Sequence, residues 1–211
     1  MNRLERGLLV LLLLALAASC VRAPFPQQMY LQHLPTAVAV ILLPLAARRG
    51  VLSPTAFTCV ILFLLLHVLG ARYIYSYVPY DTWAEKLAGI NITSRFGFRR
   101  NHFDRVVHFA FGLLSVRPVW EILTRRFKVP ARFGFYASVE FVLAFSLLYE
   151  LFEWGLTMVL SPGDAGAYNG EQGDIWDAHR DMSCAFLGAL LGLAVWRVAA
   201  WGRVGPPPNS P

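Results

Sequence analysis

The chain has 211 residues, of which 56% are hydrophobic and only 15% are charged. This composition excludes an ordinary soluble domain, in which about 25% of the residues are charged. The formal net charge is +6, but the basic residues flank the apolar runs. Membrane topology and anionic lipid head groups therefore account for the charge better than a nucleic-acid partner does.

Six apolar runs follow one another along the chain, and each is a candidate membrane-spanning helix. A span needs about 20 predominantly apolar residues. The runs are Gly7–Val21, Ala23–Ala47, Gly50–Ala71, Phe103–Leu114, Phe133–Leu160 and Met182–Trp201. The sequence thus predicts an all-α, polytopic transmembrane helical bundle of about six spans. We expect one domain at residues 1–204, followed by a disordered tail at 205–211.

The first apolar run has two interpretations, an uncleaved helix or a signal peptide, because basic residues precede both kinds of segment. An even number of spans places both termini on the same side of the membrane. Basic residues are somewhat more numerous in the segments on that side, and the positive-inside rule then predicts cytoplasmic termini. The expected location is a bacterial cytoplasmic (inner) membrane, with lipids as the expected partners.

Ionisable residues within the last four predicted spans form small clusters. Such residues are costly inside a bilayer and usually pair, contact water or serve a function. Helical spacing places the members of each cluster on one face of their helix. The clusters are His67 with Arg72, Asp104 with His108, Glu150 with Glu153, and Asp174 with Asp177 and Asp181.

The antiparallel course of the chain predicts that these clusters share one layer of the bundle. The polar residues of the third and fifth spans lie toward their carboxyl ends. Those of the fourth and sixth spans lie at their amino ends, and these spans run in the opposite direction. All four clusters are therefore expected at the same side of the membrane, which the charge bias assigns to the outer side.

A group of carboxylates with histidine suits a divalent metal ion, which is the candidate cofactor. The candidate metal ligands are Asp104, His108, Glu150, Glu153, Asp174, Asp177 and Asp181. Three of them, Glu150, Glu153 and Asp181, are also the candidate catalytic residues. The Glu-x-x-His spacing of di-iron carboxylate bundles is absent, which argues against a site of that kind.

Each cluster also has an interpretation without chemistry. Asp104 beside Arg105 is compatible with an ion pair that starts a helix, and His108 with a hydrogen-bonded core histidine. Asp174 and Asp177 would favour the positive end of a helix. Glu140, nearer the opposite side, would pair with Arg132 or extend toward the interface. Arg72, Arg105 and Arg180 are the expected partners if the acids only hold helices together.

Three strings give the chain a family resemblance: Asp104–Phe109, Tyr149–Trp154, and Gly170–Asp177 continued by Asp181-Met182. Between about Leu66 and Gly192 the chain resembles the DUF2238 family of bacterial inner-membrane proteins. It is more distantly similar to VanZ-like membrane proteins. The resemblance implies architecture and motif positions but no activity. One departure is Gly70–Tyr75, where the family usually has a Gly-Gly-His-Tyr-Thr-Tyr-like string and this chain has Arg72 in place of the histidine.

Three functions stay open at this stage. The first is a semi-buried Asp/His/Glu site near the outer face, metal-dependent if it is an enzyme, acting on a lipid-linked or envelope substrate. The second is a proton-coupled transporter, which requires a polar path toward the opposite side of the membrane, and Glu140 is the obvious residue to continue that path. The third is a structural or assembly protein whose carboxylates form helix-locking ion pairs.

Overall fold

The structure describes residues 1–159 and 172–201, the last four by their backbone alone, in a computed structural model. The predicted tail at 205–211 lies outside the described residues, as does most of the loop expected after Pro162. Within the described ranges the regular elements are all helical. The helices are α1 (Arg3–Cys20), α2 (Pro26–Gln32), α3 (Leu34–Arg48), α4 (Pro54–Arg72), α5 (Tyr80–Ala88), α6 (Ile92–Phe96), α7 (Phe103–Glu121) with the π-helical turn η1 (Ile122–Arg126), α8 (Ala131–Thr157) and α10 (Asp177–Trp201).

In the part of the chain that the structure describes, four segments are long and apolar enough to cross a membrane: Pro26–Arg48, Pro54–Arg72, Phe103–Arg126 and Ala131–Thr157. They confirm the predicted all-α membrane bundle. Helix α1 has three charged residues within its first four positions, and α10 carries several charges of its own. The count of six spans therefore stays a prediction.

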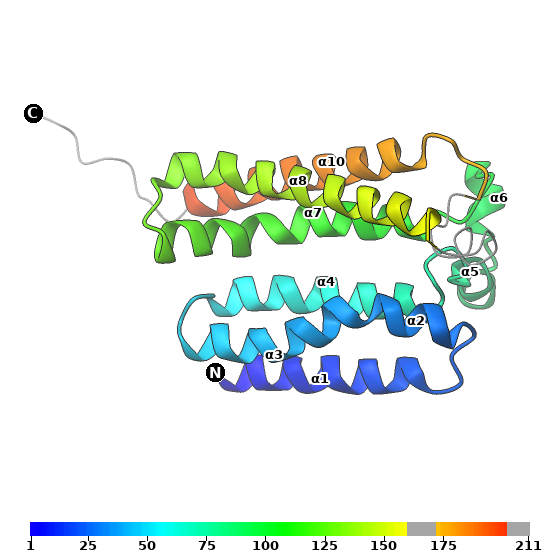
Figure 1. Cartoon of the computed structure of the whole chain (residues 1–211), viewed down its shortest axis with the longest axis horizontal. Coiled ribbons are helices and arrows are strands. Elements are labelled where there is room, and N and C mark those ends of the chain that lie inside the picture. Colours follow the sequence, from blue (N-terminus) through cyan, green and yellow to red (C-terminus); the bar gives the residue numbers. More distant parts are fainter. Residues whose placement is uncertain (160–171, 202–211) are drawn as a thin grey trace, which may run out of the picture.

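The long helices run side by side in two groups (Figure 1). One group contains α1 to α4 and the other contains α7, α8 and α10, and the packing of α4 against α7 joins them. The carboxyl ends of α4 and α8 and the amino ends of α7 and α10 lie at the same end of the molecule, beside the short helices α5 and α6 (Figure 1). This arrangement brings the charged ends of four helices together.

Helices α7 and α10 approach so closely that their glycines cannot carry a side chain. A Cβ atom on Gly112 would lie 1.9 Å from the carbonyl oxygen of Ala185, and one on Gly188 would lie 2.1 Å from that of Phe109. Small residues at helix contacts are the common means of tight packing in membranes. The close approach sets the distance between Asp104 and His108 on α7 and the acids of α10.

The second span is broken into α2 and α3 at His33. Pro35 follows the break directly, and a proline ring cannot accept the geometry of a continuous helix because it clashes with the carbonyl four residues earlier. The carbonyl oxygen of Gln32 accepts a hydrogen bond from the His67 Nε2 atom at 3.0 Å. The break therefore supplies a polar contact in the interior of the bundle.

At the opposite end of the bundle, Glu121 is fully buried and fixes the start of α4. Its carboxylate accepts hydrogen bonds of 2.7 Å from both the amide and the hydroxyl of Ser53, the N-cap residue of α4. It also pairs with Arg117 at 2.6 Å and Arg125 at 3.5 Å. The sequence predicted a span at Gly50–Ala71 but gave no sign of this partner.

We expect Glu121→Gln to lower the free energy of unfolding by about 1.5–3 kcal/mol, the usual contribution of hydrogen bonds to a charged group. The amide keeps the size of the side chain but loses the charge that two guanidinium groups require. Thermal unfolding of the detergent-purified protein measures the change. Glu140→Gln is the matched control, because Glu140 is exposed on α8. Equal melting temperatures for the two variants would contradict this role.

Candidate acidic and histidine site

An ion-pair network joins α7 to the start of α10 and includes three of the predicted metal ligands. Arg100, buried just before α7, pairs with both Asp104 and Asp177. Arg105 Nη2 lies 2.6 Å from Asp174 Oδ2 and 3.4 Å from Asp177 Oδ1. Each of these carboxylates thus has a guanidinium partner, as the helix-locking interpretation requires.

Asp174 lies at the outer edge of this network, before α10 begins. Desolvation alone would raise the pKa of Asp174, but the Trp176 amide and the guanidinium groups of Arg105 and Arg180 outweigh it and hold the pKa below its usual value. Arg180 Nη1 lies 2.6 Å from Asp174 Oδ2. Asp174 is therefore an ionised partner of arginines.

A second group of side chains lies deeper and makes only longer contacts with basic side chains, at 3.5 and 3.8 Å. His108 of α7, Glu150 of α8 and Asp181 of α10 place one ligand atom each within 4.8 Å of one another. His108 Nε2 and Glu150 Oε1 are 3.5 Å apart. The nearest cation to Asp181 Oδ1 is Arg105 Nε at 3.8 Å. Neither Glu150 Oε1 nor Asp181 Oδ1 has a hydrogen-bond partner among the described residues, although both atoms are buried.

Asp181 also belongs to a third set, with Asp104 and Asp177, whose ligand atoms lie within 4.8 Å of one another. Arg100 contacts both of the other two acids in this set. A cation there would compete with a buried guanidinium group for the same oxygens. The group of His108, Glu150 and Asp181, hereafter the inner triad, is therefore the better candidate for a metal ion.

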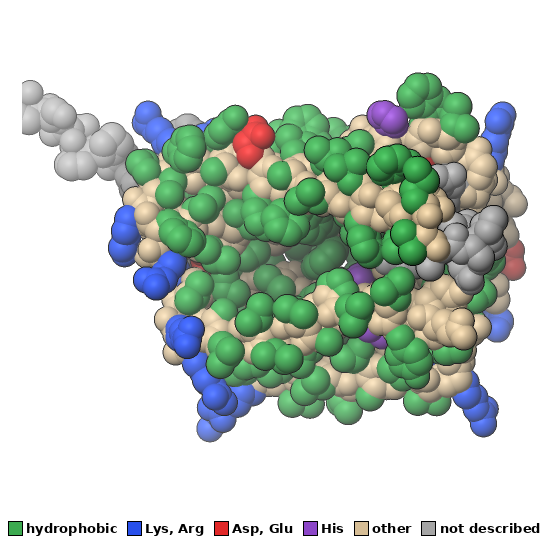
Figure 2. Space-filling view, in the orientation of Figure 1, with side chains coloured by type: hydrophobic (Ala, Val, Ile, Leu, Met, Phe, Trp, Pro, Cys, Tyr) green, Lys and Arg blue, Asp and Glu red, His purple; other side chains and the backbone are tan. Residues whose placement is uncertain are grey.

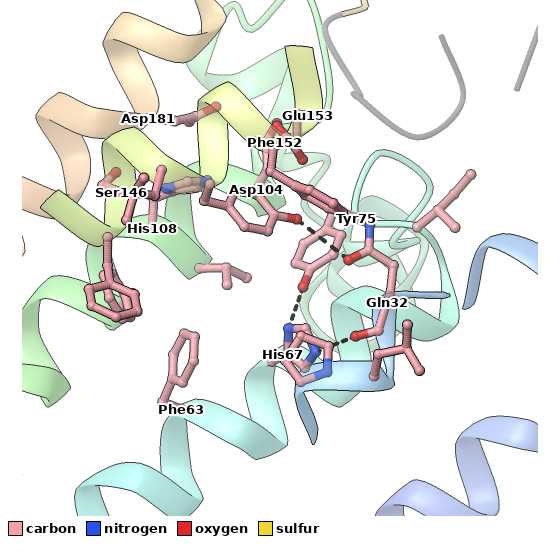
Figure 3. A pocket seen from close by; sticks show the side chains of 18 of the residues that line it. Gln32, Phe63, His67, Tyr75, Asp104, His108, Ser146, Phe152, Glu153 and Asp181 are labelled. Carbon is pink, nitrogen blue, oxygen red and sulfur yellow. Dashed lines mark hydrogen bonds between the residues drawn. The ribbon is translucent and has the colours of Figure 1, made fainter. Parts of the chain in front are cut away.

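Two members of the inner triad, His108 and Asp181, line a cavity of about 520 Å³ between the two groups of helices. His108, Asp181, Asp104 and Glu153 line one end of it (Figure 3). Glu153 is outside the inner triad, one helical turn beyond Glu150 on α8. Helix α8 ends at Thr157, within the predicted run Phe133–Leu160, so Glu153 lies about one turn from the helix end.

On the opposite wall of the cavity, His67 contacts Gln32 and Tyr75 rather than Arg72, with which the sequence analysis grouped it. The carbonyl of Gln32 can only accept, so His67 donates from Nε2 and accepts at Nδ1 from the Tyr75 hydroxyl (Figure 3). Tyr75 reaches His67 because Ile74 and Tyr75 both have positive φ angles, of 43° and 56°. A Cβ on Gly70 would lie 2.6 Å from the Tyr75 ring, so the glycine leaves room for it.

Arg72, expected as a partner of the acids, has a different role. Its Nη1 atom donates to the carbonyl oxygens of Ala18, Ser19 and Val21 at 3.1, 2.6 and 2.9 Å. These carbonyls belong to the carboxyl end of α1, where orphan acceptors favour a cation. The departure from the family string at Arg72 therefore concerns the attachment of α1 and does not add a charge to the acidic site.

The structure separates the predicted site residues into two groups. Asp104, Asp174 and Asp177 meet arginines, including Arg100, which the sequence analysis did not consider. His108, Glu150 and Asp181 converge, and Glu153 lines the cavity beside them. A signal for His67 was present, since it is an ionisable residue near the end of a span, but its contact with Tyr75 depends on the left-handed turn at Ile74 and Tyr75.

These features define an all-α integral membrane protein with a half-buried acidic and histidine cluster at one end of its bundle. The family model described as "Predicted membrane protein (DUF2238)" matches residues 4–201. The chain belongs to this family. It is 36% identical over 161 residues to the "Inner membrane protein YjdF" of Escherichia coli (strain K12), an alignment that covers 74% of this chain and 71% of that protein. No solved structure matches the chain significantly.

Proposed function

We propose that the inner triad binds one divalent metal ion, and that the resulting centre acts on a lipid-linked or envelope substrate. The observation that carries the proposal is the convergence of three ligand atoms from three helices, where Glu150 and Asp181 each have a buried carboxylate oxygen without a hydrogen-bond partner among the described residues. Buried charges are normally paired or coordinate a metal. A divalent cation would neutralise Glu150 and Asp181 together.

The spacing of the ligand atoms supports this assignment. Two atoms about 2.1 Å from an ion lie about 3.4 Å apart at the tetrahedral angle, and His108 Nε2 and Glu150 Oε1 are 3.5 Å apart. The other separations, up to 4.8 Å, shorten if a cation draws the two carboxylates inward. One imidazole with two carboxylates suits Zn²⁺, Mn²⁺ or Fe²⁺ better than Mg²⁺ or Ca²⁺.

Three protein ligands leave open positions, as in catalytic zinc sites. When bound, the metal ion would supply an activated water or polarise a substrate oxygen. Glu153 lines the cavity beside the triad without belonging to it, which suits a general base or acid. Arg105, 3.8 Å from Asp181, would fix the orientation of that carboxylate and moderate the affinity for the ion.

The location of the centre follows from the charge bias of the sequence. With both termini in the cytoplasm of a bacterium, the clustered ends of α4, α7, α8 and α10 face the outer side of the inner membrane. The name of the Escherichia coli relative supports the choice of membrane. An envelope or lipid-linked substrate is accessible on that side.

Metal content tests the proposal directly. The protein is purified in detergent, stripped with chelator, incubated with Zn²⁺ or Mn²⁺, desalted and analysed for bound metal. We expect about one ion per chain in the wild type and in Glu153→Gln. In Glu150→Gln the affinity should fall by more than about tenfold, because even outer-shell partners of metal ligands contribute about 10- to 100-fold.

Glu153→Gln is the matched control, since it makes the same chemical change on the same helix one turn away. Asp174→Asn adds a second control outside the triad. Equal, negligible metal in the wild type and Glu150→Gln would contradict the proposal and favour a purely structural role for these acids. Loss of metal in all three variants would place the ion elsewhere in the cluster.

The helix-locking function retains support for the outer acids, because Asp104, Asp174 and Asp177 each meet an arginine. It complements the metal centre by holding α7 against α10. The transporter interpretation has less support. A transporter would need Glu140 to continue a polar path toward the opposite side of the membrane. Glu140 is instead exposed on α8 and hydrogen-bonds to Tyr136, and it does not line the cavity.

A further inference from the structure

The cavity beside the inner triad opens on the side of the bundle, where lipid chains would lie. Figure 2 shows the molecule hollowed between the two groups of helices, with hydrophobic side chains around the opening. Leu34 of α3 and Phe145, Leu148 and Phe152 of α8 line the cavity and are also exposed, at 47–60% of their surface. A water-soluble molecule would have to pass this apolar rim, whereas a lipid can enter by lateral diffusion.

The interior of the cavity holds buried polar atoms that need a partner. Among the described residues, Gln32 Nε2, Ser76 Oγ, Ser146 Oγ and Asp181 Oδ1 have none, and all four residues line the cavity. Gln32 and Ser146 are 98% buried. An unpaired buried polar group is destabilising, so such groups normally have a bound partner. Gln32 Nε2 requires an acceptor, Asp181 Oδ1 requires a donor, and a hydroxyl group can satisfy either.

Charge restricts the polar part of the ligand. The described residues that line the cavity include Asp104, Glu153 and Asp181 but no lysine or arginine. In the metal-free protein, an anionic head group here would lie beside these carboxylates without a lining cation to compensate it, at a considerable cost. Hydroxyl and ester oxygens carry no such cost and match the unpaired donors and acceptors. The volume of about 520 Å³ lies within the usual range of about 300–1,000 Å³ for small-molecule sites.

We propose that this cavity binds an uncharged, hydroxyl-bearing lipid, whose hydrocarbon chain lies in the apolar mouth between α3 and α8 and whose polar head meets the inner end. The inference rests on the proposed function in that it names the class of molecule the metal centre would act on. Binding of the lipid itself depends on the cavity and the unpaired polar atoms. The two proposals can therefore fail separately.

Photolabelling tests the proposal with a monoacylglycerol that carries a diazirine and an alkyne in its acyl chain. The detergent-purified protein is irradiated with this probe in EDTA, so that metal binding does not contribute, and labelled peptides are mapped by mass spectrometry. We expect labels on α3 and α8 at the mouth, and competition by unlabelled monoacylglycerol. The lysophosphatidic acid analogue with the same chain should label these positions more weakly, because it adds a charged phosphate.

Two adjacent leucines of α8 provide matched variants. Leu148 lines the mouth, whereas the exposed Leu147 does not. Leu148→Trp should reduce specific labelling about tenfold, which corresponds to about 1.4 kcal/mol of binding free energy, and Leu147→Trp should leave it unchanged. Both substitutions are at exposed positions, and equal melting temperatures would verify the fold. Labelling that is insensitive to Leu148→Trp, or equally strong with the phosphate analogue, would overturn the proposal.

Discussion

Replacing Gly188 with alanine is expected to destabilise the protein by about 3 kcal/mol, at the upper end of the usual cost of overpacking. The added Cβ would lie 2.1 Å from the Phe109 carbonyl oxygen and 2.9 Å from the amide nitrogen of Leu113. Backbone atoms cannot move aside as a flexible side chain can, so α7 and α10 must separate. Gly112→Ala should act in the same way from the facing helix.

The control has the opposite expected sign. Gly155 of α8 has nothing within 4 Å of an added Cβ, so Gly155→Ala should gain about 0.5–1 kcal/mol from helix propensity alone. Thermal unfolding in detergent compares the variants. Metal content gives a second measurement, because separating α7 from α10 moves His108 away from Asp181. Equal melting temperatures for Gly188→Ala and Gly155→Ala would show that the close approach of the helices is wrong.

Replacing Arg100 with alanine is expected to lower the free energy of unfolding by about 3–5 kcal/mol, the usual cost of removing one member of a buried ion pair. Arg100 is 7% exposed and pairs with Asp104 and Asp177. Its loss would leave two buried carboxylates facing one another without their shared cation. The two acids come from different helices, so repulsion between them would act directly on the α7–α10 contact.

Arg99→Ala is the matched control, because Arg99 is the adjacent residue and is exposed. A change there should be nearly neutral, as for most surface substitutions. The comparison also includes Asp177→Asn in the Arg100→Ala background, which removes one of the two opposed charges and should recover part of the loss. No difference between the Arg99 and Arg100 variants would contradict the network.

The sequence predicted which end of the bundle carries the site, but it could not predict the contacts within the site. Helix periodicity places Asp104 and His108 on one face of α7, yet the rotation of that helix decides which acids of α10 each one meets. Asp104 lies toward Arg100, and His108 lies toward Glu150. Arg100 itself precedes α7 in an irregular segment, where no repeating pattern predicts the direction of a side chain.

The sequence by itself determined the class of protein and the end of the bundle where the acids gather. Long apolar runs can satisfy their backbone groups in lipid only as helices, and short connections make successive helices antiparallel. Tertiary structure alone decided which carboxylates have arginine partners, which converge with His108, and that His67 and Tyr75 face them across a cavity. These outcomes depend on helix rotation, on glycine-mediated approach and on a left-handed turn, which are contacts between residues far apart in the chain.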